Sequence, residues 1–206
     1  EMKISNVDTG WDNVASEPYT TTKTWTLLPN DGPKTVYIKY KDAAGNWTAS
    51  ACYANIMLDT IAPVIKITSP VDGFATKDAA INVIYTVDGV EKQDTETFST
   101  EGIHTITRSS TDQAGNTGSA SVNGTYDTTA PKVIITSPAD GSFTNKDTVT
   151  LEGTVDGVAF SESRALIKNS VNTLTKSVTD SAGNTGSASI TVIHDNIAPV
   201  VKNINV

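Results

Sequence analysis

The sequence has little cysteine, little histidine and few basic residues, and each shortage argues against a class of function. Its single cysteine, Cys52, cannot form a disulfide within the chain, and no second cysteine or histidine stands at metal-ligand spacing from it. The 15 lysines and arginines are outnumbered by 23 aspartates and glutamates, so the formal net charge is −8. Because nucleic acids and anionic membrane surfaces are bound by clustered basic residues, this charge disfavours both partners.

Long apolar runs are also missing. No uninterrupted stretch approaches the ~20 residues that a helix needs to cross a bilayer, so we expect no membrane insertion, and any export signal is expected upstream of the sequence. Helical periodicity is absent as well. Threonine and valine, which favour strands, are instead abundant, and glycine, asparagine, aspartate and proline punctuate the chain at turns. These features predict an all-β protein.

Four short motifs recur at a common spacing of 68 residues. Asp-x-x-Ala-Pro occurs at 59–63, 127–131 and 195–199, and Asp-x-Ala-Gly-Asn-Thr-Gly-Ser-Ala-Ser occurs at 112–121 and 180–189. The shorter motifs Thr-Ser-Pro-x-Asp-Gly and Val-Asp-Gly-Val return at the same step. A shared period indicates tandem copies of one structural unit.

The period predicts the domain boundaries. Residues 59–126 (the second segment) and 127–194 (the third segment) are two complete copies, and 195–206 are expected to form the first strand of a following repeat. Residues 1–58 (the first segment) contain the related turn Asp42-Ala-Ala-Gly-Asn46 without an Asp-x-x-Ala-Pro start, which predicts an incomplete domain that lacks its opening strands. We therefore expect the chain to be part of a longer array.

Alternating apolar and polar residues predict strands over 63–69, 79–87, 102–111 and 117–126 of the second segment. About seven short strands in each complete unit, joined by turns, are typical of a small sandwich of two antiparallel sheets. Because a few residues including a proline separate the units, we expect solution scattering to show an extended rod.

The motif pair Asp-Thr-x-Ala-Pro at the unit boundary and Asp-x-Ala-Gly-Asn before the last strand resembles the bacterial immunoglobulin-like (Big-type) repeats of large secreted or surface proteins, such as repetitive adhesins. The resemblance covers essentially the whole chain. It implies tandem immunoglobulin-like β-sandwich domains and an extracellular or cell-surface location. It is specific for the repeat fold rather than for one activity, since such modules serve as stalks, adhesin segments and enzyme accessory domains.

No catalytic constellation can be assembled from the sequence. His104 and His194 occupy non-equivalent positions in the repeat, and neither lies in a nucleophile motif or a metal-binding helix motif. The glycine clusters are better explained as turns than as phosphate-binding loops. We therefore predict structural roles for both histidines and a protein that is not an enzyme.

Two sets of three aspartates are expected to gather at the unit junctions, because an immunoglobulin-like topology places the linker and two loops at one end of each domain. They are Asp59, Asp88 and Asp112 at one junction and Asp127, Asp156 and Asp180 at the next. Calcium takes roughly six to eight oxygen ligands, and the adhesins that the chain resembles often use it to stiffen linkers. The alternative is that each carboxylate caps a turn by accepting backbone N–H groups. Calcium is the only cofactor that the sequence suggests.

Aromatic residues concentrate in the first segment, which holds all three tryptophans. Exposed rings stack on sugars, so Trp11, Trp25 and Trp47 are candidate ligand-binding residues. The alternative is that these rings pack in the core or at its rim, as tryptophans do in many sandwiches.

Together these observations predict a non-catalytic stalk or structural segment of an extracellular bacterial surface, adhesin or filament protein, joined to further immunoglobulin-like domains of its parent chain. The alternative is a carbohydrate- or protein-binding module centred on the aromatic-rich first domain, accessory to a secreted enzyme, with a glycan or a surface protein as partner. Head-to-tail self-association is a further expectation, in which Ala198–Val206 adds as a strand to the first segment of a neighbouring molecule.

Overall fold

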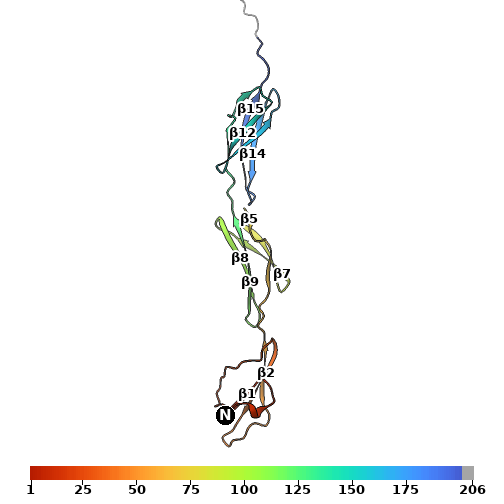
Figure 1. Ribbon diagram of the computed structural model, residues 1–206, viewed down its shortest axis with the longest axis vertical. Helices are drawn as coiled ribbons and strands as arrows, with labels where there is room; N and C mark the ends of the chain where they lie inside the picture. The colour runs from red at the N-terminus through yellow and green to blue at the C-terminus, as the bar shows by residue number, and fades with distance from the viewer. Residues whose placement is uncertain (201–206) are drawn as a thin grey trace, which may run out of the picture. The chain divides into compact units, whose positions relative to one another are not determined.

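The computed structural model describes residues 1–200, which form strands and connecting turns together with one short 3-10 turn at Trp11–Asn13. In chain order the strands are β1 (Met2–Ser5), β2 (Gly32–Tyr40), β3 (Cys52–Leu58), β4 (Ile65–Ser69), β5 (Phe74–Thr76), β6 (Ala80–Val87), β7 (Val90–Thr97), β8 (Gly102–Thr111), β9 (Thr117–Tyr126), β10 (Val133–Ser137), β11 (Ser142–Thr144), β12 (Thr148–Val155), β13 (Val158–Ala165), β14 (Ser170–Thr179) and β15 (Thr185–His194) (Figure 1). The prediction of an all-β protein is confirmed.

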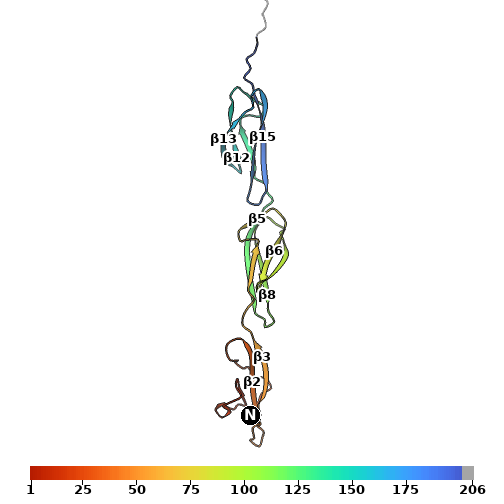
Figure 2. The ribbon, with the colours of Figure 1, turned by 90° about the vertical axis from the view of Figure 1, so that its right-hand side faces the viewer.

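The strands of the described residues form five three-stranded sheets. Their orders are β1-β2-β3 in the first segment, β4-β6-β7 and β5-β9-β8 in the second, and β10-β12-β13 and β11-β15-β14 in the third. Figure 2 shows β2 beside β3, and β12 beside β13. Two pairs depart from the expected antiparallel pairing, because the short strands β5 and β11 run parallel to β9 and β15.

In the second and third segments, each pair of sheets shares one apolar cluster. Val83 of β6 and Ile106 of β8, from different sheets, are fully buried in the second segment. Leu151 of β12 and Leu174 of β14 are their counterparts in the third, where Val192 of β15 is also buried. Strand β14 shows how the alternation works, since its side chains are buried and exposed in turn along the chain.

The first segment is built differently. Its single described sheet buries Met2 and Ile4 of β1. The connection that follows carries Tyr19, whose ring meets Tyr40 of β2 edge to face at 5.9 Å between centroids. This connection, rather than an assigned second sheet, lies against the buried face of the strands among the described residues.

The chain forms two compact units, and their borders do not follow the 68-residue period. The first unit comprises Glu1–Lys66, Thr86–Val90 and Arg108–Ala120, and the rest of the described chain forms the second. The first unit thus contains the linker at 59–63 and the second the linker at 127–131, each together with the loops that contact it. The strand predicted over 195–206 is not assigned in residues 195–200, and residues 201–206, which include most of the proposed donor segment, lie outside the described residues.

Candidate functional site

Each of the linkers at 59–63 and 127–131 lies directly on a glycine of the segment that it opens. A Cβ atom added to Gly118 of β9 would stand 1.8 Å from the carbonyl oxygen of Pro63. The same atom on Gly186 of β15 would stand 1.7 Å from the carbonyl oxygen of Pro131. The second glycine of the Asp-x-Ala-Gly-Asn-Thr-Gly motif is therefore required by a close backbone approach and not by a turn.

The asparagine two residues earlier holds the linker carbonyl. Asn116 Nδ2 donates to the carbonyl oxygen of Asp59 at 3.1 Å, and Asn184 Nδ2 donates to that of Asp127 at 2.8 Å. The first aspartate of the motif orients each amide, since Nδ2 also donates to Asp112 at 2.9 Å or to Asp180 at 3.0 Å. The Asp-x-Ala-Gly-Asn turn is thus a support that aims one amide at the linker.

The Val-Asp-Gly-Val loops grip the end of the linker through reciprocal hydrogen bonds. The backbone N–H of Val64 donates to Asp88 Oδ1 at 2.8 Å, and the N–H of Asp88 donates back to the Val64 carbonyl at 2.9 Å. Lys132 and Asp156 repeat the pair at 2.7 and 3.0 Å. Both aspartates adopt positive φ angles, of 50° and 49°, which aspartate tolerates better than most residues.

The preceding segment holds the linker from the other side. In each of three places, a side-chain oxygen directly before a strand accepts the backbone N–H of the second residue of Asp-x-x-Ala-Pro. The pairs are Asp31 with Thr60 at 3.1 Å, Glu101 with Thr128 at 2.8 Å and Asn169 with Asn196 at 3.0 Å. Glu101 also accepts the hydroxyl group of Thr128. These contacts fix where the linker leaves one segment.

Hydrogen bonds at these positions stabilise the ionised carboxylates. The Thr128 hydroxyl, followed by the Thr128 N–H, lowers the pKa of Glu101, and the Asn116 side chain lowers the pKa of Asp112. For Asp180 the largest single influence is removal from water, which raises the pKa, but the hydrogen bonds led by that of Asn184 together more than offset it. The net pKa of Asp180 is below its ordinary value of 3.8.

These lowered pKa values predict that acid loosens the linkers. A carboxyl group whose pKa is lower in the folded state adds stability above its unfolded pKa and loses that stability as the pH falls through the folded value. We expect the denaturant concentration at which the third segment unfolds, measured by hydrogen exchange, to decrease as the pH is lowered from about 5 to about 3. Asp180→Asn should reduce this pH dependence, whereas an unchanged slope would contradict the role of the carboxylate.

The first segment has the same turn but lacks the glycine equivalent to Gly118. The backbone N–H of Asn46 donates to Asp42 at 2.8 Å, as in the later turns. At the position of Gly118, however, the sequence has Thr48, whose hydroxyl accepts the N–H of Tyr40 at 3.3 Å. A side chain at this position excludes the close backbone approach that Gly118 permits.

The six aspartates predicted to bind calcium all lie at or beside the linkers, but the structure gives each carboxylate backbone donors. Ile61 N–H donates to Asp59 at 3.1 Å and Thr129 N–H to Asp127 at 2.9 Å. In the turns, the N–H groups of Asn116 and Asn184 donate to Asp112 and Asp180, each at 2.9 Å. Within residues 1–200, no three His, Cys, Asp or Glu side chains are grouped so that they could hold a metal ion. Calcium binding therefore stays a prediction, and turn capping accounts for the observed geometry.

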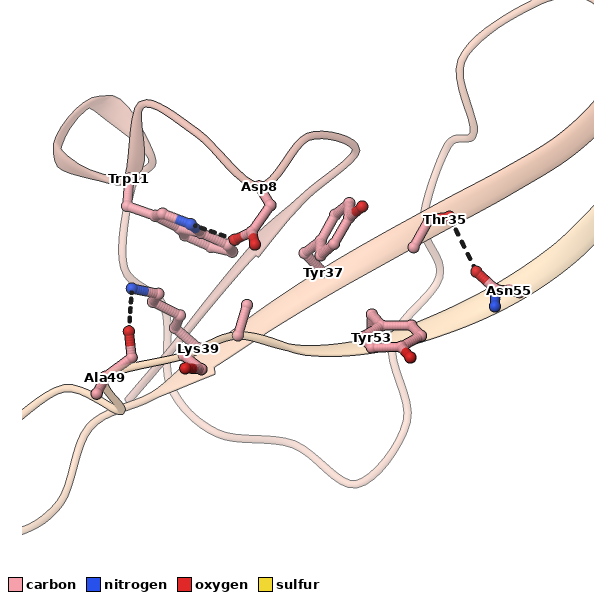
Figure 3. A pocket seen from close by; sticks show the side chains of 10 residues that line it. Asp8, Trp11, Thr35, Tyr37, Lys39, Ala49, Tyr53 and Asn55 are labelled. Atoms are coloured by element: carbon pink, nitrogen blue, oxygen red, sulfur yellow. Dashed lines mark hydrogen bonds between the residues drawn. The ribbon is translucent and has the colours of Figure 1, made fainter.

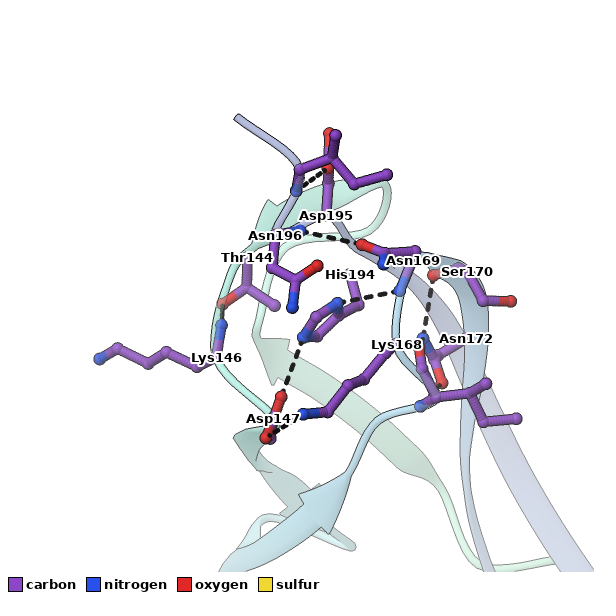
Figure 4. A network of polar contacts seen from close by, with 12 residues as sticks. Thr144, Lys146, Asp147, Lys168, Asn169, Ser170, Asn172, His194, Asp195 and Asn196 are labelled. Atoms are coloured by element: carbon purple, nitrogen blue, oxygen red, sulfur yellow. Dashed lines mark hydrogen bonds and ion pairs between the residues drawn. The ribbon is translucent and has the colours of Figure 1, made fainter. Parts of the chain in front are cut away.

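His194 is buried in a polar network at the end of the third segment (Figure 4). The backbone N–H of Asn169 donates to Nδ1 at 3.0 Å, so the ring carries its proton on Nε2, which donates to Asp147 at 3.2 Å. Lys168 Nζ lies 2.9 Å from the other oxygen of Asp147 and is the leading cause of that group's lowered pKa. His104, by contrast, contacts the Thr100 carbonyl at 2.7 Å.

Sequence reasoning missed this network, although a signal was present. The second segment has Ala79 and Tyr126 at the positions of Asp147 and His194, so the two polar residues appear together in one copy of the repeat and are absent together from the other. The paired difference agrees with the contact between Asp147 and His194 in the structure.

The three tryptophans do not form one site. Trp11 lines a pocket with Tyr37 and Tyr53, as Figure 3 shows. Trp25 lies with Met2 and Ile4 on the opposite side of the sheet, and its Nε1 donates to Asn6 at 2.9 Å. The ring of Trp47 is covered by Lys3, whose Nζ is 5.1 Å from the ring centroid.

Comparison of the chain with protein-family models, curated proteins and solved structures gives no match. The part of the chain that the structure describes contains no helix with the length and apolar character of a membrane span.

Proposed function

We propose that the chain is a non-catalytic structural segment that spaces or presents other domains of an extracellular bacterial surface, adhesin or filament protein. The observation that carries the proposal is the double attachment of the linkers, each of which is bound by the segment before it and by the segment after it. A spacer can hold its neighbours in position only where its linkers are not free hinges, and these contacts restrict the linker backbone.

The linker at 127–131 shows the attachment most fully. Its Thr128 N–H is bound by Glu101, its Asp127 carbonyl by Asn184, and its proline lies on Gly186. A direct contact supplements these, because Lys77 Nζ donates to the Gly183 carbonyl at 2.9 Å. Each such hydrogen bond alone contributes little net stability, so the restriction depends on several acting together.

We also propose that the second and third segments are tandem immunoglobulin-like sandwiches. Two sheets sharing one apolar cluster in each segment support it. The resemblance to Big-type bacterial repeats supports an extracellular or cell-surface location and further immunoglobulin-like domains as neighbours in the parent chain. The net charge of −8 would limit association between parallel chains.

Small-angle scattering tests the proposal through the linkers. We expect the wild-type chain to give an extended particle with a defined maximum dimension. The double variant Asn116→Ala, Asn184→Ala removes both linker amides and should give a more flexible ensemble with a broader distance distribution. Ser119→Ala, Ser187→Ala is the matched control on exposed neighbours of the same strands. Identical scattering from all three proteins would contradict a spacer function that depends on docked linkers.

A further inference from the structure

We propose that the first segment carries a binding site for a neutral saccharide, on the sheet face that displays Tyr37 and Tyr53. A pocket of about 500 Å³ opens on this face (Figure 3). Its volume lies within the range of roughly 300–1,000 Å³ that is typical of small-ligand sites. Strands β2 and β3 form its floor, and the loop with Trp11 forms one wall.

The floor of the pocket is an aromatic pair. Tyr37 and Tyr53 stand directly opposite each other on β2 and β3, with ring centroids 6.3 Å apart and a tilt of 50°. Tyr53 is 68% exposed, so most of its ring is free to contact a ligand. An exposed tyrosine ring offers a flat apolar face to the C–H side of a sugar while its hydroxyl group remains solvated.

The later segments lack this pair at the same place in the repeat. Tyr37 lies five residues before Asp42, and the residues five before Asp112 and Asp180 are Thr107 and Thr175. There the strands instead carry hydroxyl pairs, Thr107 with Ser121 and Thr175 with Ser189, each at 2.8 Å. The fold therefore does not need rings at this outward position, and their presence in one segment indicates binding rather than packing.

Polar groups around the rings match the hydroxyl groups of a sugar. Asp8 accepts the Nε1–H of Trp11 at 3.0 Å, and the Asn55 side chain accepts the hydroxyl of Thr35 at 2.9 Å. Both side chains line the pocket, where the Asp8 carboxylate can accept further hydrogen bonds and the Asn55 amide nitrogen can donate them. Lining of this kind suits a hydroxyl-rich ligand better than a purely apolar one.

The charges of the pocket select a neutral ligand. Its two charged side chains, Asp8 and Lys39, have opposite signs. Lys39 Nζ is already engaged, because it donates to the Ala49 carbonyl at 3.2 Å and lies 5.4 Å from the centroid of the Trp11 ring. The pocket therefore carries one cation and one anion and no net charge, which favours a neutral saccharide over a sialic acid or a sulfated sugar.

The wall of the pocket is held in place before any ligand arrives. Lys3 Nζ donates to the Trp11 carbonyl at 2.7 Å, and Lys39 lies over the indole ring. A preformed wall lowers the ordering cost of binding. Of the three tryptophans predicted as ligand-binding residues, the proposal therefore retains Trp11 and gives Trp25 and Trp47 no part in the site.

Saturation-transfer difference NMR on the full chain tests the proposal, with maltohexaose, cellohexaose, mannohexaose and N-acetylchitohexaose as neutral probes and 3′-sialyllactose as the charged comparison. We expect at least one neutral probe to show saturation transfer, with Tyr53→Ala weakening its affinity by about tenfold or more, which corresponds to ~1.4 kcal/mol. Tyr19→Ala removes a ring of similar exposure (60%) that does not line this pocket, and it should bind as the wild type does.

Three outcomes would overturn the saccharide site. They are the absence of saturation transfer from every neutral probe at millimolar concentration, equal affinity of the wild type and Tyr53→Ala, and preferential binding of 3′-sialyllactose. Because Tyr53 is exposed on the sheet surface, its truncation should leave the far-ultraviolet circular dichroism spectrum unchanged, which separates lost binding from lost folding.

Discussion

Gly186→Ala is expected to destabilise the third segment by about 3 kcal/mol, near the upper end of the usual cost of overpacking. The added methyl carbon would stand 1.7 Å from the Pro131 carbonyl oxygen, and both groups are backbone or bound directly to it. The linker therefore has to move away from β15, which also breaks the hydrogen bond from Asn184 to Asp127. The loss outweighs the ~0.4–1 kcal/mol that alanine returns by restricting the unfolded chain.

Hydrogen exchange in increasing denaturant is the appropriate measurement for Gly186→Ala, because the third segment contains no tryptophan or tyrosine. Protection should fall in β14 and β15 and in the linker at 127–131. Ser187→Ala, on the exposed neighbouring residue, should change protection little. Wild-type protection of the linker in Gly186→Ala would show that the close approach is not required.

The second large effect is expected from Gly124→Val, which should destabilise the second segment by about 2–3 kcal/mol. A Cβ atom at Gly124 would stand 2.1 Å from the ring of Phe74, its partner across the parallel pair of β5 and β9. In the third segment the sizes of the two paired residues are exchanged, since Ser142 pairs with Val192 at the equivalent positions. One copy has a large residue opposite glycine, and the other has a small residue opposite valine.

This exchange supplies a built-in rescue. Adding Phe74→Ser to Gly124→Val copies the arrangement of the third segment and should recover much of the lost stability, giving a favourable coupling energy in a double-mutant cycle. Hydrogen exchange of β6 and β9 in increasing denaturant follows the unfolding of this core, because the tryptophans of the first segment dominate the fluorescence of the chain. Additive losses in the double variant would show that the two cores are not packed in equivalent ways.

Much of the regular part of the fold could be predicted from the sequence. The strands expected over 102–111 and 117–126 correspond to β8 and β9 without a shift, because their alternation is long and a clear turn separates them. The parallel pairings of β5 and β11 were not predicted. Strands of three residues carry too little alternation to reveal which neighbour they join.

The sequence motifs predicted where the linker site lies but not what its residues do there. The repeat identified Asp112 and Asp180 as junction residues. An aspartate that caps a turn and an aspartate that binds calcium cannot be distinguished by residue type and spacing alone. The roles of Asn116 and Gly118 depend on the approach of the linker backbone at Asp59 and Pro63, which no local pattern encodes. The path of the long connection between β1 and β2 could not be predicted either, because its sequence has no regular alternation of apolar and polar residues.

The most direct test of docked linkers is a pulsed electron paramagnetic resonance measurement between spin labels on Lys92→Cys and Ser163→Cys, in a chain whose exposed Cys52 is replaced by serine. The labels lie on β7 and β13, on either side of the linker at 127–131. We expect one narrow distance distribution in this protein and a clearly broader one when Asn184→Ala removes the linker amide. A broad distribution of the same width in both proteins would contradict docked linkers.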